Sequence, residues 1–261
     1  MKPAMLIDIT KCIGCGACTK ACKEANDLPM EVDPVRTWKT WKVVEQHDGF
    51  FVPTACMHCE DPDCVSVCPV GAMEKTKLGP VIWHGDICIG CRYCVQSCPF
   101  EVPKYQWDSP TPAVGKCIMC YDRLKEGEQP ACAQVCPTEA TKYGDRNALI
   151  NEAKQRIKDD PNGYVHYIYG LKEAGGTSIL YLSSVPFEKL GFKVKGMDHE
   201  FPKLTFKVQK EVPKIFSTAF VFMYGLWWVI NRREELDGKT PEEIKQLEKD
   251  IYGLHEDDEE K

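Results

Sequence analysis

The sequence has no excess of either charge over most of its length. Lys and Arg number 33 and Asp and Glu 39, and residues 232–261 hold 6 of the basic and 12 of the acidic ones. Residues 1–231 are therefore neutral, with 27 charges of each sign. Proteins that bind nucleic acid carry a basic face, so this balance argues against a nucleic-acid partner.

The sequence also lacks an apolar run of signal-peptide length before Cys12, and it has no cysteine after Cys136. All 16 cysteines lie between these two positions. Disulfide scaffolds are typically short secreted chains. A long chain that shows no export signal of its own is better explained by thiols that bind metal.

The cysteines form four groups, which repeat in spacing more than in sequence. Groups one and three have the spacing C-x2-C-x2-C-x3-C, group two has a gap of four residues and group four a gap of eleven. Proline follows the last cysteine of groups two, three and four, whereas Lys23 follows that of group one. The groups are Cys12, Cys15, Cys18 and Cys22; Cys56, Cys59, Cys64 and Cys68; Cys88, Cys91, Cys94 and Cys98; and Cys117, Cys120, Cys132 and Cys136.

This spacing indicates iron–sulfur clusters. In bacterial ferredoxins C-x2-C-x2-C-x3-C places three thiolates on one [4Fe–4S] cluster and the fourth thiolate on another. A zinc site typically joins two C-x2-C pairs across a longer stretch and closes one tetrahedron, which is a poorer match. Sixteen thiolates at four per cluster predict four [4Fe–4S] clusters with none left over.

The sharing of fourth cysteines requires the groups to work in pairs. Groups two and three are separated only by residues 69–87, which suits one ferredoxin-like unit. Groups one and four then pair around it. Spacing alone leaves this nesting open.

The rest of the chain predicts an α+β fold. We expect strands near residues 5–9, 41–46, 50–54, 72–75 and 81–83, and a helical turn ahead of Pro69, Pro99 and Pro137. Asp145 is a candidate N-cap for a helix that ends at residues 159–163. Residues 164–169 and 177–183 predict the strands of a small β extension.

A single apolar run, Ile215–Ile230, comes late in the chain. Sixteen residues span roughly 24 Å as a helix, against a hydrocarbon core of about 30 Å. A buried core helix is the alternative. We favour a membrane anchor, because Trp227 and Trp228 precede Arg232 and Arg233 as interfacial residues do. The expected domains are thus 1–145 for the clusters, 146–211 for the extension, 212–231 for the anchor and 232–261 for an acidic tail.

The sequence resembles the electron-transfer subunits of respiratory molybdopterin oxidoreductases, most closely the iron–sulfur β subunits of formate dehydrogenase-N type. The resemblance covers about residues 5–230. The segments that carry it include Cys56-Met-His-Cys59-Glu-Asp-Pro-Asp-Cys64, Gln129-Pro-Ala-Cys132, Cys136-Pro-Thr-Glu-Ala, Gly163-Tyr-Val-His and the C-terminal anchor. Iron–sulfur subunits of membrane-bound nickel–iron hydrogenase share Cys56-Met-His-Cys59 and Val102-Pro-Lys-Tyr105, and polysulfide reductase-type subunits share the four groups.

The resemblance implies one ligand assignment, in two nested ferredoxin-like units. Cluster one takes Cys12, Cys15, Cys18 and Cys136; cluster two takes Cys22, Cys117, Cys120 and Cys132; cluster three takes Cys56, Cys59, Cys64 and Cys98; and cluster four takes Cys68, Cys88, Cys91 and Cys94. It also implies a large catalytic subunit, an integral membrane quinone-reactive or cytochrome b subunit, and a single-pass location in the inner membrane with the clusters on the periplasmic side.

We therefore predict a non-catalytic subunit that carries electrons between such partners. An enzyme acting alone is a rival, but no nucleophile–base constellation stands out. His58 and His84 are isolated and are interpreted as solvated histidines or as histidines that support a neighbouring ligand. Arg92 and Lys104 are close enough to cysteines to tune a cluster potential, but we favour surface solvation for both. A zinc-stabilised binding module is the rival from another class. Gly14, Gly16 and Gly90 beside the cysteines are expected to serve turns and to let backbone N–H groups approach sulfur.

Overall fold

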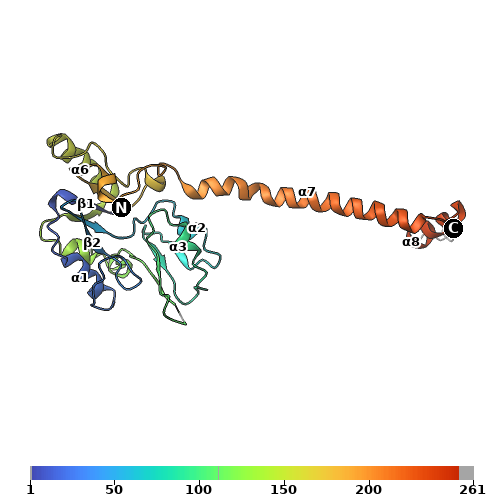
Figure 1. Cartoon of the computed structure of the whole chain (residues 1–261), viewed down its shortest axis with the longest axis horizontal. Coiled ribbons are helices and arrows are strands. Elements are labelled where there is room, and N and C mark those ends of the chain that lie inside the picture. The colour runs from blue at the N-terminus through green and yellow to red at the C-terminus, as the bar shows by residue number, and fades with distance from the viewer. Residues whose placement is uncertain (1, 111, 253–261) are drawn as a thin grey trace. The chain divides into compact units, whose positions relative to one another are not determined.

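A computed structural model describes residues 2–110 and 112–252 (Figure 1). Residues up to Leu204 form one compact unit and the residues from Thr205 another. The elements are β1 (Pro3–Asp8), η1 (Ile9–Lys11), α1 (Ala17–Ala25), β2 (Val43–His47), β3 (Phe50–Thr54), α2 (Asp63–Ser66), β4 (Met73–Lys75), β5 (Val81–Trp83), α3 (Tyr93–Ser97), β6 (Lys104–Tyr105), β7 (Val114–Gly115), α4 (Tyr121–Lys125), α5 (Ala131–Gln134), β8 (Thr141–Asp145), α6 (Arg146–Asp159), η2 (Glu173–Gly175), β9 (Ile179–Leu182), η3 (Phe187–Leu190), α7 (Phe201–Leu236) and α8 (Pro241–Tyr252).

The first unit is built on a three-stranded sheet with the order β8-β1-β9. Strand β1 pairs antiparallel with β8 and parallel with β9, and all six of its residues are buried. Successive side chains of a strand point to opposite faces. Ala4 and Leu6 accordingly pack with α6, and Met5 and Ile7 pack on the face that holds Cys18 and Cys132. The central strand thus separates a helix layer from the cysteine loops.

Helix α6 begins and ends where the sequence predicts. The Asp145 carboxylate accepts hydrogen bonds from the backbone N–H groups of Asn147 and Ala148, at 3.0 and 3.4 Å. These bonds satisfy two of the N–H groups that a helix start leaves unpaired. Leu149, Ile150 and Ala153 are buried against the sheet. The predicted N-cap is confirmed.

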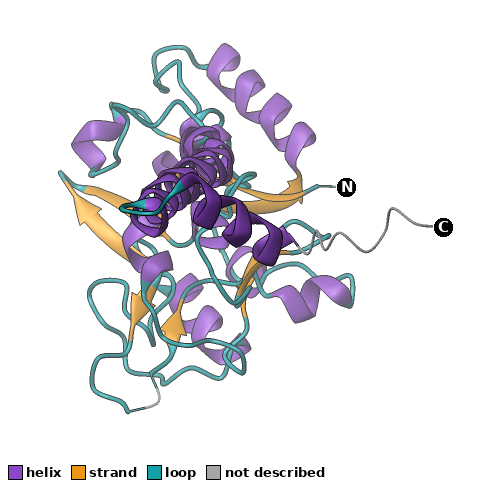
Figure 2. Cartoon of the chain, turned by 90° about the vertical axis from the view of Figure 1, so that its right-hand side faces the viewer, coloured by secondary structure: helices purple, strands orange, loops and turns teal. Residues whose placement is uncertain are grey.

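Three hairpins accompany the sheet, and Figure 2 shows their short strands among long loops. Strands β2 and β3 pair in register from Val43 with Thr54 to His47 with Phe50. Their turn has positive φ at both Asp48 and Gly49, at 47° and 85°, as a tight hairpin turn requires. The β4–β5 hairpin is likewise close to its predicted bounds.

The short helices of the cysteine groups pack in two pairs, α1 with α5 and α2 with α3. Helix α1 belongs to group one and α5 to group four, whereas α2 and α3 belong to groups two and three. Helices α2, α3 and α5 all end before Cys-Pro, as predicted. Helix α1 continues past Cys22 to Ala25, because Lys23 stands where the other groups have proline.

The strand predicted at residues 164–169 is wrong. Only an isolated bridge joins Tyr169 to Tyr181, and the N–H of Tyr167 donates to the carbonyl of Val165 at 2.7 Å. A bond between residues two apart is a γ-turn, which bends the chain away from a ladder. The other half of the predicted extension forms β9, which joins the central sheet instead of making a separate one.

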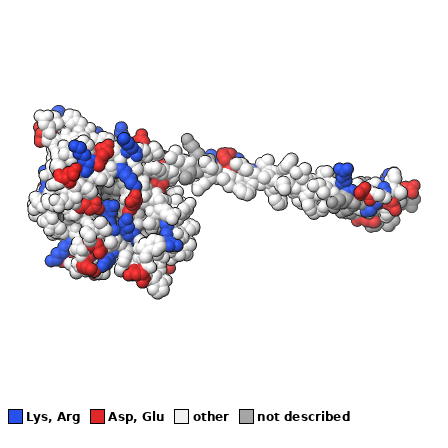
Figure 3. Space-filling view, in the orientation of Figure 1, with Lys and Arg blue, Asp and Glu red and all other residues white. Residues whose placement is uncertain are grey.

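Helix α7 is longer than the predicted span of 212–231. Its apolar part, from Ile215 to Ile230, has exposed side chains, with Phe216, Phe220 and Val221 each 71% accessible. In Figure 3 this stretch carries almost no charged atoms. This exposure is what a membrane-spanning segment would show, and it gives no support to the alternative of a buried core helix. The helix is long and apolar enough to cross a membrane.

Helix α7 continues past Pro213, which has no N–H to donate. Ser217 and Thr218 donate their hydroxyls to the carbonyls of Pro213 and Lys214, each at 2.8 Å. After α7, Thr240 and Glu243 form reciprocal bonds that start α8 within the acidic tail.

Candidate metal centres

The cysteine loops share one backbone feature, a positive φ at the residue before the second cysteine. This residue is Gly14, His58, Gly90 or Met119, with φ of 72°, 48°, 68° and 57°. A left-handed residue reverses the direction of the loop, so that the flanking thiols face inward. At Gly14 the site is also too narrow for a side chain, because an added Cβ would lie 2.5 Å from the Phe51 ring.

The sixteen thiols are all free, and the loops bring them into four sets. Within each set the thiols interact electrostatically with one another. The sets correspond to the four groupings that the resemblance implies. The first set is Cys12, Cys15, Cys18 and Cys136; the second is Cys22, Cys117, Cys120 and Cys132; the third is Cys56, Cys59, Cys64 and Cys98; and the fourth is Cys68, Cys88, Cys91 and Cys94. That each set binds a cluster remains a prediction.

The sets follow one another in a row. The thiol of Cys132 in the second set interacts with Cys18 in the first. Cys117 of the second set interacts with Cys56 of the third, and both belong to one buried apolar cluster. Cys64 of the third set interacts with Cys94 of the fourth. The order along the row is therefore first, second, third, fourth.

Only the sets at the two ends of the row have an exposed cysteine. Cys15 of the first set and Cys91 of the fourth are exposed, while all four cysteines of the second set are buried. The residue after the first cysteine of each C-x2-C loop is also exposed at both ends, with Ile13 at 59% and Ile89 at 64% accessibility. The row thus opens to the surface at its ends and is enclosed in the middle.

The chemistry of the thiols fits a metal-bound group. Burial raises the pKa of Cys94 and of Cys98 to about 11, and that of Cys117 to about 12. Such thiols keep their protons at neutral pH unless a metal displaces them. The first set also frames a small cavity of about 20 Å³. In residues 2–110 and 112–252, no three His, Cys, Asp or Glu side chains converge on a position for a single metal ion.

Several hydrogen bonds to sulfur accompany the sets. The backbone N–H of Met119 donates to Cys117 Sγ at 3.3 Å, and that of Ala72 donates to Cys68 Sγ at 3.2 Å. The Asn26 amide lies 3.9 Å from the sulfur atoms of both Cys22 and Cys120. Donors to thiolate sulfur are one means by which proteins set cluster potentials.

The four non-cysteine residues singled out from the sequence have different surroundings. His58 is buried, and its Nδ1 accepts the N–H of Val81 at 3.0 Å. His84 is paired with Glu74 at 2.8 Å on the surface. The Arg92 guanidinium lies over the rings of Tyr105 and Trp107, at 5.5 and 5.0 Å. The side chain of Lys104 is partly buried in β6.

Sequence reasoning missed three buried lysines, Lys23, Lys42 and Lys116, whose residues are at most 2% accessible. Lysine is almost never fully buried without a partner. No local pattern marks these three positions, because their burial depends on segments far away in the chain. For Lys23 and Lys116 the sequence contains one signal of a structural role, which is their position next to Cys22 and Cys117.

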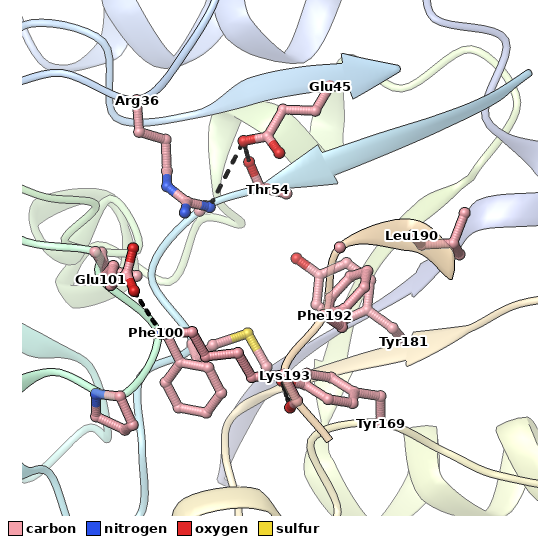
Figure 4. A pocket seen from close by; sticks show the side chains of 15 residues that line it. Arg36, Glu45, Thr54, Phe100, Glu101, Tyr169, Tyr181, Leu190, Phe192 and Lys193 are labelled. Carbon is pink, nitrogen blue, oxygen red and sulfur yellow. Dashed lines mark hydrogen bonds and ion pairs between the residues drawn. The ribbon is translucent and has the colours of Figure 1, made fainter. Parts of the chain in front are cut away.

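A cavity beside the third set contains no obvious catalytic group (Figure 4). Its charged side chains are paired, Arg36 with Glu45 at 3.9 Å and Lys193 with Glu101. Glu45 also accepts the hydroxyl of Thr54 at 2.8 Å. The aromatic wall is formed by Phe100, Tyr169, Tyr181 and Phe192.

Comparisons with known proteins agree with these features. One 4Fe-4S dicluster domain model matches residues 47–146 and another matches residues 11–72, which together include every cysteine. The chain is 37% identical to the iron–sulfur subunit of nitrate-inducible formate dehydrogenase of Escherichia coli, with 69% of this chain and 67% of that one covered. It is 36% identical to the hydrogenase-2 operon protein HybA of Escherichia coli, with 71% of each covered.

A protein of Nitratidesulfovibrio vulgaris is 35% identical over 93% of this chain and 70% of its own length. Identities above one third over most of the chain, together with two dicluster domains, leave no doubt about the relationship. The chain belongs to the family of iron–sulfur subunits with 4Fe–4S dicluster domains that includes the formate dehydrogenase iron–sulfur subunit and HybA.

Proposed function

We propose that this chain conducts electrons through four [4Fe–4S] clusters, between a catalytic subunit and a quinone-reactive or cytochrome b subunit in the membrane. The observation that carries the proposal is the row of four thiol sets, enclosed in the middle and exposed at both ends. An exposed set at each end gives one contact for a donor and another for an acceptor.

The sixteen thiols are the proposed ligands, in the four sets defined above. When bound, a [4Fe–4S] cluster accepts and releases one electron. The buried cysteines exclude water from the middle of the row, which confines exchange with soluble molecules to its ends. The residues around Ile13 and Ile89 are the proposed contacts with the two partners, because exposed apolar side chains beside the end sets are suited to a protein interface.

We further propose that α7 anchors the chain in the inner membrane, with the thiol sets outside the cytoplasm and α8 inside. Its uncovered apolar side chains support the anchor. Lysines and arginines do not decide the orientation, because five lie shortly before the apolar run and five shortly after it. The orientation rests on the resemblance, in which the cluster domain is exported with its catalytic partner.

The catalytic partner is proposed to be a molybdopterin subunit of formate dehydrogenase type. A nickel–iron hydrogenase is the second candidate, since the identity to HybA, 36%, is nearly the same as that to the formate dehydrogenase subunit, 37%. The match to dicluster domains favours either of them over a zinc-stabilised binding module.

Purification of the intact complex from membranes tests this proposal. We expect a brown preparation that contains a large catalytic subunit, in which formate reduces the clusters without added mediator. Reduction by hydrogen and not by formate would select the hydrogenase candidate. A colourless, zinc-containing chain without a large subunit would contradict the proposal.

A further inference from the structure

The ammonium groups of two of the three buried lysines donate hydrogen bonds to nearby oxygen atoms. The Lys23 ammonium donates to the carbonyls of Pro29 and Lys39 and to the Thr40 hydroxyl, at 2.7 to 2.9 Å. The Lys116 ammonium donates to the carbonyls of Val81 and Cys117. These two lysines cross-link loops, and their burial needs no further explanation.

Lys42 is different. Its residue is 2% accessible, and within the described part of the chain its Nζ has no hydrogen-bond partner. Burying an ammonium group without a partner is strongly unfavourable, so such a group is normally neutralised or lies beside an anion. The groups around Lys42 show whether its ammonium is neutralised or lies beside an anion.

The charged neighbours of Lys42 are thiols from two different sets. Its ammonium interacts electrostatically with Cys18 of the first set and with Cys117 and Cys132 of the second. Cys22, also of the second set, interacts with it in turn. Thiolates that hold the proposed clusters would supply the negative charge that a buried ammonium group requires.

The chain on both sides of Lys42 fixes it at this border. Trp41 packs against the apolar cluster that contains Cys56 and Cys117. Val43 begins β2, which contacts the helix that carries Cys18 and Cys22. The Lys42 side chain is thus held between the first and second sets and is not free to reach solvent.

We propose that Lys42 is a shared electrostatic tuning residue, a fixed buried cation that raises the reduction potentials of the clusters of the first and second sets. A [4Fe–4S] cluster with four thiolate ligands is an anion that gains a further negative charge on reduction. A cation inside the protein, where screening is weak, favours the reduced form. The inference rests on the proposed four-cluster function.

The test is a potentiometric titration of the intact complex, followed by electron paramagnetic resonance, for Lys42→Met. Methionine keeps an unbranched side chain and removes the charge. We expect the reduction equilibrium constants of the first and second clusters to fall about tenfold, which is ~59 mV for a one-electron couple. The third and fourth clusters should keep their potentials. Lys42→Arg, which retains the charge, should restore the first and second potentials.

Lys20→Met is the matched control. Lys20 lies on α1 between Cys18 and Cys22, but its side chain is 70% accessible and its charge is screened by water. We expect no shift. Equal shifts from Lys20→Met and Lys42→Met, equal shifts of all four clusters, or no shift in Lys42→Met would each overturn the inference.

Iron analysis of the same samples separates the inference from the function on which it rests. If the unsubstituted complex lacks four clusters, the proposed function fails. If Lys42→Met loses iron, the inference requires that the loss affect only the first and second sets and that Lys42→Arg prevent it. Loss from the third and fourth sets, or no rescue by arginine, would show a packing role instead.

Discussion

Cys98 directly follows α3 in the third cysteine group, yet its thiol belongs with those of the second group. Its neighbours in the buried apolar cluster are Cys56 and Cys117, not Cys88 or Cys91. The thiol of Cys98 lies away from its own group because α3 carries the chain one turn away from the loop that precedes it. Each Cys-Pro end thus links one loop to another that is distant in sequence.

Cys98→Ser should therefore damage the cluster held by Cys56, Cys59 and Cys64 and spare the one held by Cys88, Cys91 and Cys94. Spectroscopy of the separate cluster signals measures this directly. The matched variant Cys94→Ser, in the same helix, should have the opposite effect. Anomalous density that places Cys98 and Cys91 on one cluster would contradict the pairing.

Gly14 and Gly16 differ in a way that can be tested. Both have positive φ, 72° and 71°, but only at Gly14 would a Cβ meet another side chain, the Phe51 ring. An alanine at Gly16 should cost only the backbone strain, about 1–2 kcal/mol. Gly14→Ala adds the clash, so we expect a lower thermal unfolding midpoint and loss of iron from the first set. Equal midpoints for the two variants would contradict this account of the loop.

At the scale of elements, what the sequence predicts well is what local patterns determine. The cysteine spacing, the Cys-Pro stops and the Asp145 cap each involve residues within a few positions of one another, and the structure contains the expected turns. The parallel pairing of β9 with β1 joins residues about 170 positions apart, and no local signal specifies it. The burial of Lys42 likewise depends on segments that are distant in the sequence.

The membrane role of α7 gives a prediction for a truncated chain. Ending the chain after Val212 removes the apolar part of the helix, so the thiol-bearing unit, expressed without its partners, should appear in the soluble fraction. Ending it after Leu236 removes α8 and the tail but keeps α7 whole. That control should remain with the membrane after a high-salt wash. Membrane retention of the shorter chain would show that another surface anchors it.

The orientation of α7 can be tested with protease added to intact spheroplasts. If the thiol sets lie outside the cytoplasm, residues beyond Arg233 should be protected and the unit before α7 should be accessible. Permeabilised cells provide the control in which both parts are cleaved. Digestion of the tail with protection of the thiol-bearing unit would reverse the proposed topology.

At the scale of the whole molecule, the fold serves to hold four thiol sets in one order. The sheet of β8, β1 and β9 supports the first and second sets on one face, and the pair α2 and α3 holds the third and fourth. The enclosed middle and exposed ends suit a conductor that receives electrons at one place and delivers them at another. The chemistry that supplies these electrons belongs to the proposed catalytic subunit.

The central claim, four clusters in one chain, is tested most directly by measuring iron and acid-labile sulfide in protein purified without oxygen. All sixteen cysteines belong to one of the four sets. Four cubane clusters therefore predict about sixteen iron and about sixteen sulfide per chain. A value near eight iron per intact chain, as in a two-cluster ferredoxin, would contradict the account.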